Sequence, residues 1–310
     1  MRMVVTGAAG FVGSHVVEAV ARDGLDVVAV DAPRRSLTPG VTRERWRWLG
    51  GRAGVVPLEL DLAVDDLAPL AAADVVVHLA GRPGVRDSWG PGEAAVERDN
   101  VVASRRLLEA CARRGTKVVV ASSSSVYGPA GARASREDDP LAPASPYARS
   151  KAEVERLARA AADAGLPVTV LRYFSVYGPR QRPDMAFHRF IAAALAGRPL
   201  PVFGDGTALR SFTHVGDVVT ATTAAVRATL PPGTVVNVGS GEPTSVNDAI
   251  ALISDHLGIE PRITAHAPIP GDVPRTHADP TRAAALLDWT PAVPLDVGLK
   301  DQITWQRGAP

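Results

Sequence analysis

Short valine-rich runs alternate with stretches of helical length over the first 173 residues, and this alternation limits the fold more than any other feature. Strands are predicted at 2–6, 26–31, 55–60, 74–79, 116–122 and 167–173. Helices are predicted between them at 12–23, 66–72, 92–114 and 146–164. Repeated β-α units of this kind form a parallel sheet with helices on both faces. The pattern therefore predicts an α/β protein with a Rossmann-type, doubly wound parallel sheet.

The composition of the chain changes after residue 173, where prolines become frequent. Shorter helices are predicted there at about 184–196, 215–229, 245–257 and 280–287. We predict a dinucleotide-binding domain over 1–173, with later pieces near 211–240, and a smaller interleaved C-terminal substrate-binding domain over 174–210 and 241–310. No clean linker separates them, so a cleft is expected between the two. Residues 32–54 are expected to form a long loop whose Trp46 and Trp48 pack on an adenosine or only on the protein.

Composition narrows the function classes. The 310 residues are 46% hydrophobic and 22% charged, as in globular proteins. With 34 basic and 33 acidic residues, the chain gives little reason to expect a nucleic-acid partner. It shows neither a signal peptide nor an apolar run long enough for a membrane span, so the expected location is cytoplasmic. The single cysteine, Cys111, reads as a small core residue, and the seven scattered histidines do not suggest a metal site.

A glycine-rich turn follows the first predicted strand and opens the first helix, reading Gly7-Ala8-Ala9-Gly10-Phe11-Val12-Gly13. Such a turn brings backbone N–H groups close to a pyrophosphate. Asp31 ends the next strand, where a carboxylate accepts hydrogen bonds from the adenosine ribose and repels a 2′-phosphate, so NAD is favoured over NADP. Arg34 and Arg35 either bind such a phosphate or lie in a solvated loop.

Two further strand ends are expected beside the same dinucleotide. Asp61-Leu62 follows the third strand and Leu79-Ala80-Gly81 follows the fourth. Both lie at the carboxyl edge of the predicted sheet, where Rossmann folds bind their ligands. The alternative is that they are ordinary strand ends.

The strongest chemical signal is the pair Tyr147 and Lys151. Residues four apart share one face of a helix, so the ammonium group can favour the ionised form of the phenol. Upstream, Ser122 to Ser125 place hydroxyls at the end of the fifth strand, and one of them can hydrogen-bond a substrate oxygen while the phenolate takes its proton.

With these residues the chain resembles the extended short-chain dehydrogenase/reductase superfamily, in particular the NAD-dependent nucleotide-sugar epimerases and dehydratases, from residue 3 to about 305. The matching motifs are Thr6-Gly7-Ala8-Ala9-Gly10-Phe11-Val12-Gly13, His78-Leu79-Ala80-Gly81, Ser124-Ser125-Val126-Tyr127-Gly128, Tyr147-Ala148-Arg149-Ser150-Lys151, Arg210-Ser211-Phe212-Thr213-His214-Val215-Gly216-Asp217, Asn237-Val238-Gly239-Ser240-Gly241 and Gly271-Asp272-Val273-Pro274-Arg275-Thr276-His277-Ala278-Asp279. The resemblance implies that Tyr147 is the catalytic base, that Lys151 activates it and binds the nicotinamide ribose, and that Ser123 is the hydroxyl partner. It also implies that Asn100 lies near the cofactor and that a homodimer forms through helices 92–114 and 146–164.

The resemblance further implies oxidation at the sugar C4 by bound NAD⁺. Relatives that then eliminate water or CO₂ typically carry an acidic residue where this chain has Ser124 and Ser125, and serine is a poor general acid. We therefore expect simple return of the hydride to the opposite face, which is 4-epimerisation. The stretch 172–188 looks like that of UDP-glucuronate 4-epimerases, in which Ser175 and Arg182 match the pair that grips the C6 carboxylate. The alternative for Arg182 is a surface cation.

By family position the pyrophosphate of a UDP-sugar is expected at Arg86, Arg210 and Arg275. Phe187 and Val202 either flank the uracil or belong to the core. Other activities stay open, namely 4-epimerisation of UDP-glucose, UDP-N-acetylglucosamine or a dTDP-sugar, dehydration or decarboxylation of a nucleotide sugar, and a net oxidoreductase. A non-catalytic NAD sensor is a further class, which an intact Ser123, Tyr147 and Lys151 disfavours.

Overall fold

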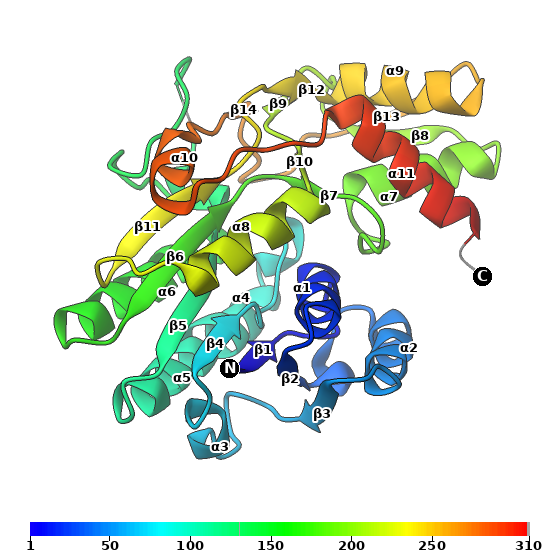
Figure 1. Cartoon of the computed structure of the whole chain (residues 1–310). Coiled ribbons are helices and arrows are strands. Elements are labelled where there is room, and N and C mark those ends of the chain that lie inside the picture. Colours follow the sequence, from blue (N-terminus) through cyan, green and yellow to red (C-terminus); the bar gives the residue numbers. More distant parts are fainter. Residues whose placement is uncertain (130, 309–310) are drawn as a thin grey trace.

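A computed structural model describes residues 1–129 and 131–308 of the chain. Its centre is a seven-stranded sheet in the order β11-β6-β5-β4-β1-β2-β3 (Figure 1). The strands are β1 (Arg2–Thr6), β2 (Asp26–Asp31), β3 (Val55–Glu59), β4 (Val75–His78), β5 (Lys117–Ser123), β6 (Val168–Tyr173) and β11 (Thr234–Val238). Every neighbouring pair runs parallel. The predicted Rossmann-type α/β fold is confirmed.

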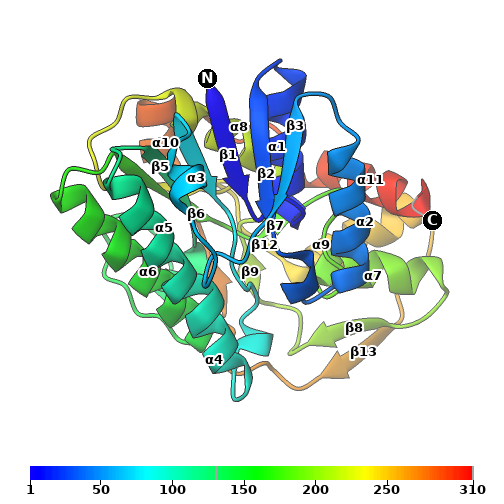
Figure 2. The same cartoon turned by 90° about the horizontal axis from the view of Figure 1, so that it is seen from below.

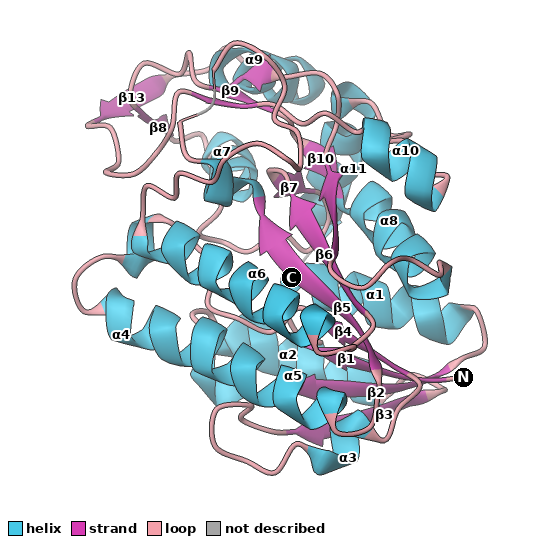
Figure 3. Cartoon of the chain, turned by 90° about the vertical axis from the view of Figure 1, so that its left-hand side faces the viewer, coloured by secondary structure: helices cyan, strands magenta, loops and turns pink. Residues whose placement is uncertain are grey.

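Helices cover both faces of this sheet, as Figure 3 shows edge-on. One face carries α1 (Phe11–Arg22), α8 (Val215–Arg227) and α10 (Thr281–Leu287). The other carries α3 (Ala68–Ala71), α5 (Ala103–Ala112) and α6 (Pro146–Asp163). Alternation along the strands feeds two separate cores, because successive side chains point to opposite faces. Val4 and Val76 thus pack with α5, whereas Val5 and Val77 pack with α1.

The prediction of a long loop at 32–54 was wrong, because α2 (Pro39–Gly50) occupies most of it. The helix buries Thr42, Arg45 and Leu49 at spacings of three and four. A charged residue in the middle of the buried stripe hides the amphipathic pattern on which a sequence reading depends. Trp46 and Trp48 lie on this helix, packed against the first core.

The expectation that every predicted strand is covered on both faces also needs correction at β3. This strand is the outermost one, on the side of α2 in Figure 2. Val56 is 59% exposed, and Pro57 has no N–H to give to a further strand. The predicted helix 92–114 is continuous but not uniform, since α4 (Gly92–Val96) passes through a π-helical segment at Glu97–Val102 before α5.

The remaining chain forms a smaller body beyond the carboxyl ends of the strands, packed around a third core. Its helices are α7 (Ala186–Leu195), α9 (Val246–Leu257) and α11 (Leu295–Gly308), the last not predicted. Its strands are β7 (Val176–Tyr177), β8 (Leu200–Phe203), β9 (Leu209–Arg210), β10 (Thr213–His214), β12 (Thr244–Ser245), β13 (Ile263–His266) and β14 (Arg275–Thr276). The predicted division into dinucleotide and substrate domains stays a prediction; α10, within the predicted substrate part, lies on a face of the main sheet, and the last two residues lie outside the described part. Among the described helices, none is long and apolar enough to cross a membrane.

Candidate active site

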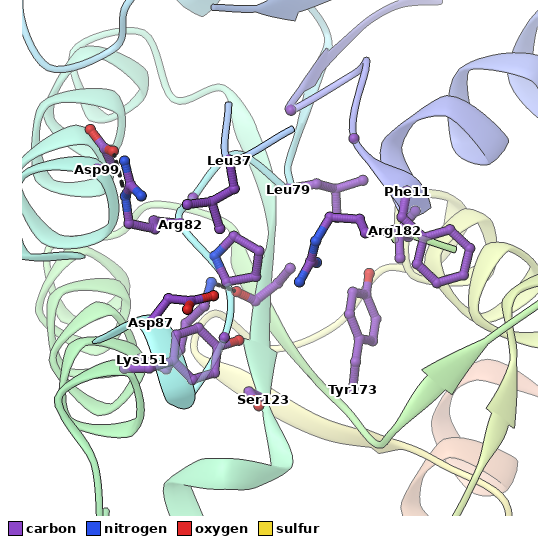
Figure 4. Close-up of a pocket in the computed structure, with 18 of the residues that line it drawn as sticks. Phe11, Leu37, Leu79, Arg82, Asp87, Asp99, Ser123, Lys151, Tyr173 and Arg182 are labelled. Atoms are coloured by element: carbon purple, nitrogen blue, oxygen red, sulfur yellow. Dashed lines mark hydrogen bonds and ion pairs between the residues drawn. The ribbon is translucent and has the colours of Figure 1, made fainter. Parts of the chain in front are cut away.

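A cleft of about 680 Å³ runs along the carboxyl edge of the sheet, and residues of the smaller body line its other side; Figure 4 shows part of its lining. The predicted residues that line it are Gly7, Gly10, Phe11, Val12, Gly13, Asp31, Asp61, Leu62, Leu79, Ala80, Gly81, Arg86, Ser123, Ser124, Ser125, Tyr147, Lys151, Ser175, Arg182 and Arg210. Positions as far apart in sequence as Gly7 and Arg210 thus meet on one surface. Parallel strands bring this about because their carboxyl ends all lie at the same edge.

Four predicted residues are not among those that line the cleft. Phe187 and Val202 are each 2% exposed in the third core, where the Phe187 ring packs 4.5 Å from that of Phe212. Arg275 lies on β14, and its guanidinium group is 3.4 Å from His277 Nδ1. Phe187 and Val202 therefore fit the alternative that they belong to the core, and we assign neither to the nucleobase. Asn100 lies behind the cleft wall.

The glycine-rich turn is built for close approach. Gly7 has φ of +69°, and a Cβ there would lie 2.7 Å from the Ala80 nitrogen. Asp31 holds the turn, because its Oδ2 accepts a hydrogen bond from Ala9 N at 2.8 Å and its Oδ1 accepts one from Ala32 N at 2.7 Å. Burial raises the pKa of Asp31, while these two donors act in the opposite direction. Each carboxylate oxygen keeps a second lone pair for a ribose hydroxyl.

Arg35 lies beside carboxylates. Its Nη2 is 3.2 Å from Asp99 Oδ1 and its Nε is 4.0 Å from Asp61 Oδ2. Burial pushes the pKa of Asp61 up, but hydrogen bonds from Arg98, at 2.6 Å, and from Ala63 N, together with the charges of Arg98 and Arg35, leave that pKa lowered. Arg34 is 3.8 Å from Glu59. Both arginines are therefore paired with carboxylates.

The catalytic candidates lie together beneath the centre of the cleft. Helix α6 starts at a serine cap, with Ala148 N donating to Ser145 Oγ at 3.1 Å, and this start presents Tyr147 and Lys151 on one face. Lys151 Nζ donates to the Ala121 carbonyl at 3.0 Å, and burial lowers the pKa of Lys151 to about 8. Burial raises the pKa of Tyr147, whereas a hydrogen bond with Ser123 and the charge of Arg182 lower it.

Asn100 braces this arrangement from behind. Its Oδ1 accepts from Arg82 N at 2.6 Å, and its Nδ2 donates to Ser150 Oγ at 2.8 Å, next to Lys151. A Cβ on Gly81 would lie 2.8 Å from Asn100 Oδ1, so a larger residue there would displace the Asn100 side chain. The π-helical turn sets this register, and nothing in the sequence indicated that turn.

Sequence reasoning also missed a buried polar network under the fifth strand. Arg172 donates to both carboxylate oxygens of Glu155, at 3.0 and 2.7 Å, and to the Tyr127 hydroxyl at 2.7 Å. Ser122 Oγ donates to Glu155 at 2.5 Å. The Tyr127 hydroxyl also donates to Asn237 Oδ1 at 2.7 Å, and Tyr127 does not line the cleft, so this tyrosine has a structural role and Tyr147 remains the candidate base.

The loop after β7, residues 178–185, carries Arg182 into the cleft, and we call it the substrate loop. The guanidinium group projects toward the middle of the cleft in Figure 4. Its Nε and Nη2 donate to Asp184 at 3.0 and 2.7 Å. Ser175 lines the same region with φ of 28°, an unusual backbone conformation for a residue other than glycine.

The other predicted cations lie along the outer part of the cleft. Arg210 Nη2 donates to Asp272 at 2.6 Å, and its side chain is 13% exposed. The Arg86 guanidinium lies over the Phe203 ring, 4.3 Å from its centroid. Both cations remain candidates for the pyrophosphate.

A Rossmann-type sheet that carries a glycine turn, an acidic strand end, a serine, a tyrosine and a buried lysine at one edge defines a dinucleotide-dependent enzyme of the short-chain dehydrogenase type. Residues 3–239 match the model of the NAD dependent epimerase/dehydratase family. The chain belongs to this family, and its cofactor is NAD.

The relatives agree with this assignment over the full length. The chain is 38% identical to the uncharacterized UDP-glucose epimerase YtcB of Bacillus subtilis over 98% of both chains. It is similar to the Bacillus cereus UDP-glucuronic acid 4-epimerase solved with UDP-glucuronic acid and NAD, with TM-score 0.93, 36% identity and 99% of both chains covered. It is also similar to MoeE5, solved with NAD and either UDP-glucuronic acid or UDP-glucose, with TM-score 0.89, 41% identity and 99% of both chains covered.

Proposed function

We propose that this enzyme converts UDP-glucuronate to UDP-galacturonate by inverting C4. The observation that carries the sugar assignment is Arg182, a largely buried guanidinium that projects into the cleft close enough for its charge to act on Tyr147. A planar guanidinium pairs well with a carboxylate. The similar Bacillus cereus enzyme, named a UDP-glucuronic acid 4-epimerase, supports the same substrate.

The residues along the carboxyl edge fit NAD. The glycine turn opens α1, whose first-turn N–H groups would bind the pyrophosphate, and Asp31 would accept hydrogen bonds from the adenosine ribose. Lys151, beside Gly81, is the candidate for the nicotinamide ribose. When bound, NAD⁺ supplies the acceptor for the hydride from C4 and gives that hydride back.

The proton steps belong to Tyr147. Its phenolate takes the proton of the C4 hydroxyl as C4 is oxidised, and returns it after the sugar has presented its other face. Ser123 orients the reacting oxygen by a hydrogen bond. Lys151 stabilises the phenolate through its charge, and its own proton is held in place by the Ala121 carbonyl.

The positions that follow Ser123 hold no acidic residue that would divert the 4-keto intermediate. Ser124 and Ser125 follow Ser123, and Ser125 Oγ donates to Ser123 Oγ at 2.9 Å. Serine cannot serve as the extra proton carrier that elimination requires. A 4-keto uronate loses CO₂ when the bond to its carboxylate lies perpendicular to the plane of the ketone. Arg182 and Ser175 would hold the carboxylate away from that alignment.

Arg182 can bind that carboxylate without first losing Asp184. The Nε and Nη2 edge of the guanidinium is taken by Asp184, whereas the edge formed by Nη1 and Nη2 points away from it. A guanidinium carries five donors in a fixed plane, which is enough for two carboxylates.

The test is direct. Purified protein is incubated with UDP-glucuronate without added reductant, and the sugar products are identified by NMR. We expect UDP-galacturonate to accumulate up to an equilibrium mixture without net NADH release. A mixture that stays unchanged, or that yields only a pentose or a dehydrated sugar, contradicts the proposal.

Neutral UDP-hexoses are the second candidate substrates, and Asp184 favours them. It neutralises Arg182 within the cleft, so a sugar with a C6 hydroxyl leaves no buried charge without a partner. UDP-glucose in the same assay, at equal concentration, separates the two substrates by their kcat/KM.

Two features of the molecule stay predictions from the sequence, namely a homodimer through the helices at 92–114 and 146–164 and a cytoplasmic location. Both remain secondary to the activity. Light scattering during size exclusion tests the dimer, and a mass of one chain would contradict it.

A further inference from the structure

The substrate loop is fastened to the dinucleotide side of the cleft. His15 on α1 donates from Nε2 to the Pro179 carbonyl at 2.8 Å. Arg180 Nη2 lies 2.5 Å from His15 Nδ1 and donates to Glu18 on the same helix at 2.6 Å. Burial, and next the Arg180 charge, lower the pKa of His15 to about 3, so the neutral ring can accept at Nδ1. In Figure 1 the loop between β7 and α7 descends toward α1.

Arg45 joins this loop to the glycine-rich turn. The side chain comes from α2, and the residue is 8% exposed. Its Nη1 donates to the Ala9 carbonyl at 3.3 Å and its Nη2 donates to the Arg180 carbonyl at 3.0 Å. Burial lowers the pKa of Arg45 to about 10, so the group remains charged at neutral pH and both hydrogen bonds are charge-assisted.

The peptide at Ala9 is therefore held from two directions. Its N–H donates to Asp31, the predicted ribose ligand, and its carbonyl accepts from Arg45. The other end of the path, the Arg180 carbonyl, lies two residues before Arg182. Arg180 has φ of 63°, a conformation that surrounding contacts must maintain in a residue other than glycine.

The opposite side of the substrate loop is anchored to the smaller body. Gly178 N donates to Gln302 Oε1 at 2.9 Å, and Gln302 Nε2 donates to Gln181 Oε1 at 2.9 Å. Gln302 belongs to α11 and is fully buried. The loop thus spans the two walls of the cleft, and Arg45 connects it to the wall that holds the dinucleotide.

We infer that Arg45 is a positioning residue that couples occupancy of the dinucleotide site to the grip of Arg182 on the sugar carboxylate. A ligand that rests on the glycine turn and Asp31 steadies the Ala9 peptide, and Arg45 passes this constraint to the backbone before Arg182. Coupling of two sites in this way is reciprocal. The inference rests on the proposed function, since it concerns the same carboxylate.

The test compares holoenzyme variants in the UDP-glucuronate assay. Arg45→Met keeps the length of the side chain and removes its donors. We expect KM for UDP-glucuronate to rise about tenfold, the loss typical of a charge-assisted hydrogen bond, with kcat changed by less than about twofold. The dissociation constant of UDP alone, measured by calorimetry, should stay unchanged because UDP carries no C6 carboxylate. Arg47→Met, an exposed arginine on the same helix, is the matched control and should behave as wild type.

A double-mutant cycle then separates positioning from general damage. In an Arg182→Ala background, Arg45→Met should add no further increase in KM, because the group that it positions is gone. An increase of the same factor in both backgrounds, or an unchanged KM in the single variant, overturns the inference.

A second variant guards against loss of folding. Arg180→Gly suits the left-handed backbone and removes the clasp on His15 and Glu18, and it should raise KM for UDP-glucuronate without changing the affinity for UDP. An unchanged KM in Arg180→Gly overturns the inference if Arg45→Met does not fold. Absence of turnover by the wild-type enzyme contradicts the proposed function itself, whereas normal wild-type turnover with an unaffected Arg45→Met contradicts only the coupling.

Discussion

Lys151 and Arg182 face the same cleft from opposite walls, and the two cations are held in different ways. On the sheet wall, Lys151 is buried and donates to the uncharged Ala121 carbonyl. On the wall formed by the smaller body, Arg182 and Arg210 are each paired with a carboxylate, at 2.7 and 2.6 Å. The side chains of those carboxylates, Asp184 and Asp272, are 35% and 49% exposed.

The difference separates chemistry from recognition. Groups that move protons are fixed by burial and by neutral partners, so no competing charge has to leave before reaction. Groups that recognise an anion are each paired with a partly exposed carboxylate, whose negative charge weakens the attraction of the cation for a substrate anion. Changes on the sheet wall should therefore affect kcat, and changes on the other wall should affect KM and selectivity.

The largest effect is expected from Tyr147→Phe. Removal of the phenol oxygen takes away the only group proposed to move the C4 proton, so kcat should fall by at least about 10³-fold. Product formation followed by NMR measures the loss. Circular dichroism and the amount of NAD that copurifies should match the wild type, and a variant that keeps a tenth of the activity would remove Tyr147 from its role.

Arg182→Ala should act mainly on KM. Loss of a bidentate guanidinium should raise KM for UDP-glucuronate by about 10- to 100-fold and leave KM for UDP-glucose within about twofold. A decarboxylated pentose should also appear among the NMR products, because the carboxylate is no longer held. An equal rise in KM with both sugars would show that Arg182 does not recognise the C6 carboxylate, and would contradict the proposed contrast between the two walls.

Asp184→Asn sharpens the same contrast with a smaller change. The amide keeps the shape of the side chain but removes the charge that competes with the substrate carboxylate. We expect the ratio of kcat/KM for UDP-glucuronate to that for UDP-glucose to rise by about 3- to 10-fold. Competition kinetics with both sugars in one tube measures the ratio directly, and a fall in that ratio contradicts the idea that the Asp184 charge opposes binding of the substrate carboxylate.

The smallest effect near neutral pH concerns His78, which lies at the end of β4 on the sheet wall. Its ring hydrogen-bonds Thr6 and Ser104 at 2.8 and 2.9 Å, and burial lowers its pKa to about 3. The unfolded chain binds a proton near 6.5, so stability is complete above that pH and is lost as pH falls toward 3. The slope should be about 1.4 kcal/mol per pH unit for this residue.

Urea unfolding at pH 7 and pH 5 measures that slope. His78→Asn should reduce the slope by about 1.4 kcal/mol per pH unit, the contribution of one proton, although the variant is less stable overall. An identical slope in the two proteins would mean that His78 does not titrate between the folded and unfolded states as proposed. His15 should add a similar slope, since burial and Arg180 hold its pKa near 3 as well.

Most of the sheet wall was predictable. The strands are short apolar runs, a pattern that predicts buried strands directly. Tyr147 and Lys151 share a face because residues four apart in a helix always do. Helix α2 was not predictable, since its buried stripe contains Arg45, whose contacts come from Ala9 and Arg180. Helix α11 was not predicted because a buried glutamine, Gln302, interrupts its apolar face. The hydrogen-bond partners of Gln302 lie in the substrate loop.

Predictions on the other wall depended on family position and were less secure. Phe187 and Val202 were candidates for the nucleobase, yet both are buried in the third core. The sequence cannot distinguish an apolar side chain that contacts a nucleobase from one that packs in the interior, because the hydrophobic effect is not directional. Asp184 and Asp272 were not singled out, although each pairs with a predicted arginine.

By itself the sequence determined the parallel sheet, the glycine turn with Asp31, and the alignment of Tyr147 with Lys151. These depend on periodicity and on residues within a few turns of one another. Only the tertiary structure decided which cations share the cleft, which carboxylates neutralise them, and how Arg45 joins the turn to the substrate loop. Those relations depend on how distant segments pack in three dimensions, and no local pattern of residues encodes a distance between two chain segments 135 residues apart.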